Sequence, residues 1–569
     1  MTQEEQLCRE QILSEDYMDF VLEYPVARPP VFGEYGAYCM EVVNPLYAVA
    51  HLSRERAPFY NVADYGFRAI PSLFSLQETT SMESAGILRA QTLPVPGLRG
   101  EGVIVGVIDT GIDYTHPVFR RADGGSRILR IWDQTDQTGG PPAGLPYGTE
   151  YRQEQLDAAL RQPDPRSLVP TADENGHGTF LAGIAAGSEM PDGSFIGAAP
   201  DASLAVVKLK PAKENLKAYY LVDTEQPVYQ ETDILLAVRY LLDLREQLAM
   251  PLVICLGLGT NRGGHDGYTP LEEVLSRPTD LGGLVPVAAA GNEGNRAHHY
   301  FGILNEEEEY RDVELRIPPG ESGFRMDFWA QAPELYAVGF LSPGGEEVPR
   351  IPPQAGSSQE IGFVLEETAI TVDYRLVEVR SGSQLISMGF RQPTPGIWII
   401  RIYNTYRIAG QFHLWLPVEG QAEPGTYFLE PSPDTTLTIP STGDGVLTVG
   451  AYNHRADSIY IHSGRGYTRL GAVKPDLAAP GVSVYGPVPG GGFATFSGTS
   501  VAAAHAAGAA ADLLHWGIVR GNEPRMDINA VRAYLILGAR RKAVYSYPNR
   551  EWGYGALDLY GVFETLKMS

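Results

Sequence analysis

The chain has 569 residues, of which 44% are hydrophobic and 20% charged, an ordinary globular balance on a length that exceeds a single hydrophobic core. Two or three domains are therefore expected. The formal charge of −25 argues against nucleic acid and anionic membranes as partners, and no apolar stretch is long enough to predict a membrane span.

The first 80 residues differ in their sequence pattern from the rest of the chain. Residues 17–24 alternate like a β-strand, and residues 47–52 could pair with them. The N-terminus is acidic and lacks a basic region followed by an apolar run, so we expect no signal peptide. The three cysteines, Cys8, Cys39 and Cys255, are few and odd in number, which predicts no disulfide framework and a reducing compartment.

The apolar run from Gly102 to Ile108 is rich in β-branched residues and predicts a buried parallel strand that ends at Asp109. A carboxylate at the C-terminal end of such a strand lies in the crevice where parallel sheets carry their sites. The alternative is a turn aspartate that caps the next segment.

Glycines flank His177 on both sides, and a helix of small residues is expected after it. The glycines allow other groups to approach the imidazole ring closely. A lone histidine is more often structural, so both interpretations stay open for this residue taken alone.

Strands and helices then alternate along the chain. Apolar runs predict strands at 204–209, 251–256 and 284–290, and helical spacing of apolar residues predicts a helix at 233–248. This alternation indicates an α/β fold with a doubly wound parallel sheet and a site at the strand ends.

Residues 298–441 follow another pattern. Apolar residues alternate in several short runs, and Pro and Gly punctuate them, as at 318–320 and 343–345. Many short strands with such turns predict an inserted β-sandwich or jelly roll. Nothing in its sequence marks a sugar or metal site. An apolar run at 446–450 then resumes the core sheet.

Ser500 stands at the start of a helix made almost wholly of small residues, expected over 499–508. Such a helix suits the centre of a domain, where neighbouring backbones come close. A serine before a helix is commonly an N-cap, and the alternative is a nucleophile beside the N–H groups of the first turn.

Asp109, His177 and Ser500 occur in the chain order that distinguishes subtilisin-type enzymes from other serine hydrolases. With the stretch Val287 to Gly294, which contains Asn292, these motifs make the chain resemble the subtilase family of serine proteases. The resemblance implies that Ser500 is the nucleophile, His177 the general base and Asp109 the group that orients it. Asn292 and the backbone N–H of Ser500 would form the oxyanion hole.

The same resemblance implies a substrate-binding set. Gly257, Leu258 and Gly259 would pair with the substrate backbone, and Ala290 and Gly291 would line the site beside the asparagine. Glycines suit a strand that an extended peptide approaches closely, although a plain strand-end turn would also explain them. No cofactor or metal is expected, and three polar residues near the motifs are interpreted as structural: Asp113, His116 and Asp173.

The resemblance divides the chain into four segments. The segments are a propeptide at 1–80, a subtilase domain at 81–297 and 442–569, and the β insert at 298–441. The propeptide would template folding and block the active site, with residues 70–80 in the substrate cleft. We expect the scissile bond after Gln77, with neighbouring bonds as alternatives.

A long propeptide without a signal sequence, together with a β insert between the asparagine and the serine, resembles the clostridial Csp subtilases. That resemblance implies a role in spore germination, a propeptide that stays bound after cleavage, and the zymogen of a spore cortex-lytic hydrolase as substrate. It also implies cytoplasmic synthesis and packaging in the spore. The alternatives are a sensor or scaffold with an occluded site, and a general intracellular subtilase.

Overall fold

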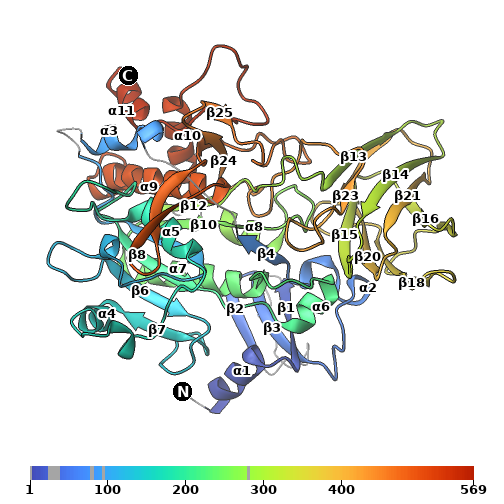
Figure 1. Cartoon of the computed structure of the whole chain (residues 1–569), viewed down its shortest axis with the longest axis horizontal. Coiled ribbons are helices and arrows are strands. Elements are labelled where there is room, and N and C mark those ends of the chain that lie inside the picture. The colour runs from blue at the N-terminus through green and yellow to red at the C-terminus, as the bar shows by residue number, and fades with distance from the viewer. Residues whose placement is uncertain (1–2, 24–38, 77–82, 93–96, 278–281, 569) are drawn as a thin grey trace.

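A central β-sheet organises the computed structural model, which describes residues 3–23, 39–76, 83–92, 97–277 and 282–568 (Figure 1). Its strands run in the order β25-β24-β12-β10-β5-β8-β6-β7, with β26 beside β24. The pairs from β24 to β6 are parallel, and the edge strands β25 and β7 are antiparallel. The bounds are β5 (Ile104–Asp109), β6 (Ile128–Asp133), β7 (Thr149–Arg152), β8 (Ser203–Lys208), β10 (Leu252–Leu256), β12 (Leu284–Ala289), β24 (Leu447–Asn453), β25 (Ser458–Ile459) and β26 (Leu477–Pro480).

Helices cover both faces of this sheet, which confirms the predicted α/β class. Alternate residues of a strand point to opposite faces, so Val105 and Val107 pack with α5 (His177–Ala186) and α9 (Thr499–Leu514). Ile104 and Ile108 pack instead with α7 and α8. The remaining bounds around the sheet are α3 (Ile87–Gln91), α4 (Gln153–Ala159), α6 (Glu214–Tyr220), α7 (Glu231–Leu248), α8 (Pro270–Ser276), α10 (Ile528–Gly538), α11 (Leu559–Met568), β9 (Tyr229–Gln230), β11 (Leu258–Gly259), β27 (Val484–Val488) and β28 (Gly492–Phe496).

Helix α9 lies in the centre of the domain, as its composition predicts. Every residue of α9 is buried. A Cβ on Gly508 would lie 2.2 Å from the Cβ of Ala198 and 2.6 Å from the carbonyl oxygen of Ala185, so only glycine allows this close packing against α5 and its neighbours. The small side chains therefore bring the start of α9 against the ends of the strands.

The N-terminal region forms a small α+β unit. Strands β1 (Tyr17–Glu23), β3 (Tyr47–Ser53) and β2 (Cys39–Asn44) form an antiparallel sheet in that order, next to α1 (Gln3–Leu13). The predicted pairing of residues 17–24 with 47–52 is confirmed, because β1 pairs with β3. We call the described residues 3–23 and 39–72 the N-terminal module; they include α2 (Val62–Tyr65). Strand β4 (Leu73–Leu76) follows the module.

The expectation of no disulfide is wrong for one pair of cysteines. Cys8 and Cys39 are bonded to one another, which joins α1 to β2, and Cys255 is free and buried. The count of cysteines could not reveal this pairing because it depends on α1 packing beside a strand 31 positions away in sequence. With Glu41 the two cysteines also form a cluster of potential metal ligands, but the bond between the sulfurs uses the thiolates that a metal would need.

Residues after β12 form two antiparallel sheets, ordered β13-β22-β15-β20-β19-β18 and β17-β16-β21-β14-β23. Side chains of both sheets enclose one apolar cluster, and the alternating residues that predicted these strands are buried in it. The more specific assignment to a jelly roll stays a prediction. The bounds are β13 (His299–Leu304), β14 (Tyr310–Ile317), β15 (Gly323–Ala330), β16 (Tyr336–Leu341), β17 (Glu347–Ile351), β18 (Ser358–Gly362), β19 (Ala369–Arg375), β20 (Gln384–Arg391), β21 (Gly396–Asn404), β22 (Gly410–Trp415) and β23 (Tyr427–Phe428).

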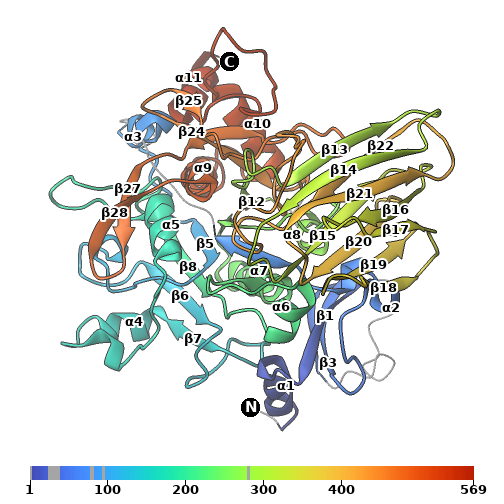
Figure 2. The ribbon, with the colours of Figure 1, turned by 45° about the vertical axis from the view of Figure 1, so that its right-hand side comes forward.

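The N-terminal module contacts both the core and these two sheets, which we call the β insert. Figure 2 shows the module below the insert, and α2 lies against β19. The four predicted segment boundaries stay predictions. Among the described residues, no helix is both long enough and apolar enough to cross a membrane.

Candidate active site

Three of the predicted site residues lie within hydrogen-bonding reach of one another. Asp109 is the last residue of β5, His177 the first residue of α5 and Ser500 the second residue of α9. The Nδ1 atom of His177 lies 2.8 and 3.0 Å from the two carboxylate oxygens of Asp109, and its Nε2 atom lies 3.2 Å from the Oγ atom of Ser500. All three side chains are buried.

A second carboxylate fixes the start of α5 relative to β5. Asp173 accepts hydrogen bonds from the backbone N–H groups of Gly176 and Thr179 and from the hydroxyl of Thr179. It also accepts from the hydroxyl of Thr110, which in turn accepts from the N–H of Gly178. Asp173 therefore acts as a cap of the helix that carries the histidine.

Gly257 stands directly beside the reacting groups. A Cβ at this position would lie 2.5 Å from the Cδ1 of Leu181, 3.0 Å from the Cε1 of His177 and 3.1 Å from the Cβ of Ser500. No side chain fits in that space, so glycine keeps β11 close to the serine and the histidine. The predicted pairing of residues 257–259 with a substrate backbone stays a prediction.

The amide of Asn292 is oriented by Thr499. Its Oδ1 atom accepts hydrogen bonds from the backbone N–H of Thr499 at 3.1 Å and from the hydroxyl of Thr499 at 3.2 Å. Because the amide oxygen points to Thr499, the NH₂ group points the opposite way, with two donors for another acceptor. The hydroxyl of Thr499 also accepts from the N–H of Gly291 at 3.1 Å, which ties this loop to α9.

The two residues before the asparagine are buried in the protein. The carbonyl oxygen of Ala290 accepts from the N–H of Thr438, and that of Gly291 accepts from the N–H of Gly464. Gly291 has φ of +90°, a conformation that favours glycine. Both residues thus support the asparagine through their backbones, and their predicted part in substrate binding stays a prediction.

Strand β4 lies between two short strands at this edge of the core. Leu76 and Ser75 pair antiparallel with Leu258 and Gly259 of β11, and Leu73 and Phe74 pair with β9. Just before β4, the backbone of Ser72 is bound twice by Glu231, whose N–H donates to the Ser72 carbonyl and whose carboxylate accepts from its N–H. The segment therefore has an extended backbone of the kind that a peptide substrate adopts. Gln77 lies outside the described residues.

Asp113 and His116, interpreted as structural, have structural contacts. Asp113 accepts from Thr115 and from the N–H of Gly490. Burial alone would raise the pKa of the Asp113 carboxyl, but these hydrogen bonds lower it. The ring of His116 accepts from the N–H of Val118 and lies 2.9 Å from the carbonyl oxygen of Gly492.

Sequence reasoning missed three contributors to this site, namely Thr499, Glu231 and the strand β9. A threonine before a helix resembles an ordinary capping residue, and a glutamate at a helix start is commonly favoured by the helix dipole. Only the folded structure shows what these side chains bind, because it brings residues 291–292 next to Thr499 and Ser72 next to Glu231. The short strand β9 has two residues and offers no periodicity to detect.

This geometry and a comparison with known sequences identify the class of protein. The sequence profile of the subtilase family matches residues 100–316 and 427–555 and omits most strands of the β insert. The chain belongs to the subtilase family.

Among solved structures, the chain is similar to the CspB protease of Clostridium perfringens. The two share 34% sequence identity with a TM-score of 0.76, over 86% of this chain and 99% of the other. The predicted resemblance to the subtilases and to their clostridial Csp group is thereby confirmed.

Curated relatives match over shorter parts of their length. The major intracellular serine protease of Bacillus subtilis is 26% identical over 37% of this chain and 50% of its own length. The subtilisin-like protease SBT2.2 of Arabidopsis thaliana is 24% identical over 81% of this chain and 59% of its own. The chain thus spans about half the length of these curated relatives.

Proposed function

We propose that the protein is a self-processing serine endopeptidase. The observation that carries this proposal is the line of hydrogen bonds from Asp109 through His177 to Ser500. An ionised carboxylate only accepts hydrogen bonds, so Asp109 holds the proton of His177 on Nδ1 and leaves Nε2 able to accept. In that tautomer the imidazole can remove the proton from the hydroxyl of Ser500.

The chemistry then follows from the groups beside the serine. As Oγ of Ser500 attacks a peptide carbonyl, the carbonyl oxygen gains negative charge. The NH₂ group of Asn292 and the backbone N–H of Ser500 are the proposed donors to this oxyanion. His177 then returns the proton to the leaving amine, and water repeats the sequence to release the acyl group.

The pairing of β4 supports cleavage of the chain's own N-terminal segment. Ser75 lies opposite Gly259 and Leu76 opposite Leu258, so a strand continued in this register would bring its next residue opposite Gly257, the residue beside Ser500. Cleavage after Gln77 agrees with that register. The N-terminal module would then be a propeptide, and β4 would remain as the first product strand.

The test is the N-terminal sequence of the purified protein. We expect the wild-type chain to begin at Glu78 in its larger fragment and Ser500→Ala to stay a single chain of 62.0 kDa. Trimming of Ser500→Ala at the same bond in purified protein would contradict self-cleavage. Substituting Gln77 by Pro should block the cut.

We further propose that the substrate is the zymogen of a spore cortex-lytic hydrolase, and that the protein is made in the cytoplasm and packaged in the spore. The similarity to the CspB protease supports this role. Incubation of the purified enzyme with the zymogen should release an N-terminal fragment, and Ser500→Ala should release none. Cleavage of unrelated proteins at equal rates would favour a general intracellular subtilase.

One observation favours a second candidate, an occluded sensor or scaffold. Strand β4 takes the place between β9 and β11 that a substrate would need, and Ser500 is fully buried. Such a protein would cut itself once and then cleave nothing else. Turnover of a peptide substrate only after removal of the N-terminal fragment would favour the occluded protein. Turnover with that fragment still bound would favour the endopeptidase.

A further inference from the structure

The segment that leads into β4 is held by groups outside the candidate catalytic set. The hydroxyl of Tyr220 donates to the carbonyl oxygen of Pro71 at 2.9 Å. Glu231 binds both backbone groups of Ser72, with its N–H 2.8 Å from the carbonyl oxygen and its carboxylate 3.2 Å from the N–H. Leu73 then pairs with β9. The backbones of three successive residues are therefore held by the core, through contacts that do not depend on their side chains.

The side chain of Leu73 is enclosed by the core and the β insert. It is 2% exposed and belongs to an apolar cluster that includes Tyr220 and Val222 of the core and Trp415 of the insert. The same four residues line an unfilled space of about 20 Å³, which is room for about one water molecule. Leucine therefore nearly fills this pocket, which we call the Leu73 pocket.

The walls of the Leu73 pocket do not come from the N-terminal module. Apart from Leu73 itself, the described residues that line it belong to 220–262 of the core and 325–421 of the insert. These walls remain when the module is removed. The pocket is therefore available to a second polypeptide that lies in the same cleft.

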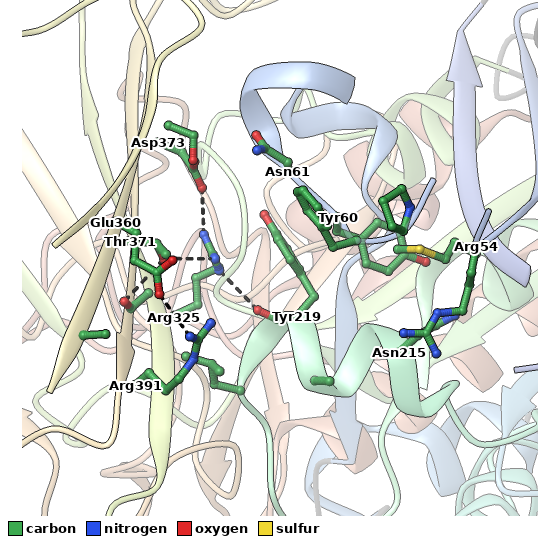
Figure 3. A pocket seen from close by; sticks show the side chains of 18 residues that line it. Arg54, Tyr60, Asn61, Asn215, Tyr219, Arg325, Glu360, Thr371, Asp373 and Arg391 are labelled. Carbon is green, nitrogen blue, oxygen red and sulfur yellow. Dashed lines mark hydrogen bonds and ion pairs between the residues drawn. The ribbon is translucent and has the colours of Figure 1, made fainter. Parts of the chain in front are cut away.

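Helix α6, which carries one wall, is fixed between the module and the insert. Figure 3 shows Tyr219 of this helix between Tyr60 of the module and Arg325 of the insert. The ring centres of Tyr60 and Tyr219 are 5.4 Å apart, and the guanidinium of Arg325 lies 4.3 Å from the centre of the Tyr219 ring. Arg325 also donates to the carbonyl oxygen of Tyr219 at 3.3 Å. The insert therefore helps to position the next residue, Tyr220.

The charged residues around the pocket are already paired. The guanidinium of Arg262 lies 4.6 Å from the centre of the Tyr220 ring and pairs with Asp327 at 3.1 Å. Arg325 pairs with Asp373 at 2.9 Å. Because each guanidinium has its own carboxylate, a charged side chain placed here would be buried without a counter-charge of its own. The pocket therefore favours an uncharged apolar side chain of about the size of leucine.

We propose that the core and the β insert together form a subsite for a large aliphatic side chain at the fifth residue before the scissile bond. The numbering rests on the proposed cleavage after Gln77, for which Leu73 is that residue. Tyr220 and Glu231 hold the backbone just before it, whereas the pocket selects the side chain. The substrates of the enzyme are then polypeptides that carry leucine, isoleucine or methionine at this position.

Hydrogen exchange on the full chain measures how firmly the segment is held, and it needs no catalysis in the Ser500→Ala background. Leu73→Lys would bury an ammonium beside Arg262, so it should raise the exchange rate of the amides at 72–76 at least about tenfold. Leu73→Met keeps the volume and should raise that rate less than about threefold. Unchanged exchange in Leu73→Lys, or an equal rise in both variants, would overturn the proposal.

A matched pair of tryptophan variants tests the part of the insert. Trp415→Phe reduces one wall of the pocket and should raise exchange at 72–76 about threefold or more. Trp398 is also a buried tryptophan of the insert whose indole donates to a backbone carbonyl, but it packs in the insert's own apolar cluster. Trp398→Phe should therefore leave exchange at 72–76 unchanged. Equal exchange in the two variants would mean that the insert takes no part in the subsite, and the proposal would be wrong.

The rate of self-cleavage separates this subsite from the proposed proteolysis. In cell-free synthesis of the full chain, Leu73→Lys should slow the loss of the 62.0 kDa species at least about tenfold. Leu73→Met should be cut at nearly the wild-type rate, as should Phe59→Ser, a control in the module whose side chain is 59% exposed. Normal cleavage of Leu73→Lys would overturn the subsite and leave the proteolysis standing. A wild-type chain that is never cut would contradict the proteolysis, and the exchange result alone would then decide whether the pocket holds Leu73.

Discussion

The core holds its N-terminal module and its β insert by partly different chemistry, although each face contains a buried ion pair. Against the module, the carboxylate of Asp19 is buried and lies 2.7 Å from the ammonium of Lys213, 2.6 Å from His51 and 2.5 Å from the amide of Gln230. This face depends on ionised side chains that are fully removed from water. The pairing is specific, because a buried charge requires its own partner.

Against the insert, the core presents the neutral ring of His265. This ring stacks on Trp415 of the insert at 4.0 Å, and His299 and His413, which also belong to the insert, stack on the same indole. His299 and His413 also share a hydrogen bond of 2.9 Å between their ring nitrogens. Burial lowers the pKa of His265 to about 4 and that of His299 to about 3, and it holds the pKa of His413 well below its usual value. This face combines histidines that stay neutral with a buried ion pair between Arg262 of the core and Asp327 of the insert, 3.1 Å apart.

The difference teaches that acid acts on the two faces in separate ranges of pH. The insert face loses stability when histidines take up protons, and the module face when a carboxylate does. The lowered pKa of Asp19 results from Lys213 and His51, whose charges outweigh the effect of burial. The following predictions test whether the faces are as distinct as these contacts indicate.

The largest effect is expected from Lys213→Met. Met keeps most of the volume but leaves the Asp19 carboxylate buried without its main counter-charge, which should lower the free energy of unfolding by about 3–5 kcal/mol. Urea unfolding at pH 7 measures this loss. The added substitution of Asp19 by Leu should restore part of it, because the orphaned charge is then gone.

Lys217→Met is the matched control, because Lys217 lies in α6 and Lys213 is the residue that precedes this helix. Lys217 pairs with Glu214, whose side chain is 73% exposed, so its loss should cost less than about 0.5 kcal/mol. Equal losses for the two lysine variants would mean that the buried pair does not hold the module.

Acid titration should weaken the insert face first. A histidine whose folded pKa lies below its unfolded value of about 6.5 binds fewer protons when folded, so stability falls as pH falls below 6.5 and continues to fall until the folded pKa is reached. For His299 the loss between pH 7 and pH 5 should be about 2 kcal/mol. The Asp19 contribution, with a lowered pKa, is lost only below about pH 4.

The charged groups near the rings are Arg469, which disfavours protonation, and Glu293, which favours it at His265. In His299→Gln the free energy of unfolding should decline less between pH 7 and pH 5, by the amount that one histidine contributes. Its decline below pH 4 should remain. An unchanged slope in that variant would show that His299 does not titrate between the folded and unfolded states.

A substitution in the active-site cleft should lower catalytic activity, whereas the substitutions at the two faces lower the free energy of unfolding. Thr499→Val removes the hydroxyl that binds Asn292 and Gly291, so kcat for a peptide substrate should fall about tenfold, or about 1.4 kcal/mol, with KM unchanged. Thr499→Ser keeps the hydroxyl and should keep the activity. A rise in KM at constant kcat would mean that the threonine affects binding instead of the oxyanion donor.

Local patterns in the sequence predicted much of the fold and the identity of the site candidates. The strand at 204–209 and the helix at 233–248 match β8 and α7 within two residues, because apolar periodicity reports burial directly. The motifs around Asp109, His177 and Ser500 single out residues that the structure brings together. Their catalytic roles rest on the proposed experiments.

Contacts between distant segments could not be predicted in this way. Asp19 and Lys213 are 194 positions apart, and nothing local to either residue indicates that they meet. The same applies to Thr499, whose hydroxyl orients an amide 207 positions earlier. Such contacts depend on how whole units pack, and that information is spread over every residue of both surfaces.

The smallest effect is expected where the module and the insert touch one another directly. Arg380 of the insert pairs with Glu23 of the module and lies 3.4 Å from Glu273 of the core, with the side chain of Arg380 30% exposed. Partly exposed pairs are screened by water, so Arg380→Gln should cost less than about 1 kcal/mol. A double-mutant cycle with Glu23→Gln measures the coupling between the two side chains. A coupling above about 2 kcal/mol would mean that the module and the insert stabilise one another across this rim, and the core would then no longer hold them through two independent faces.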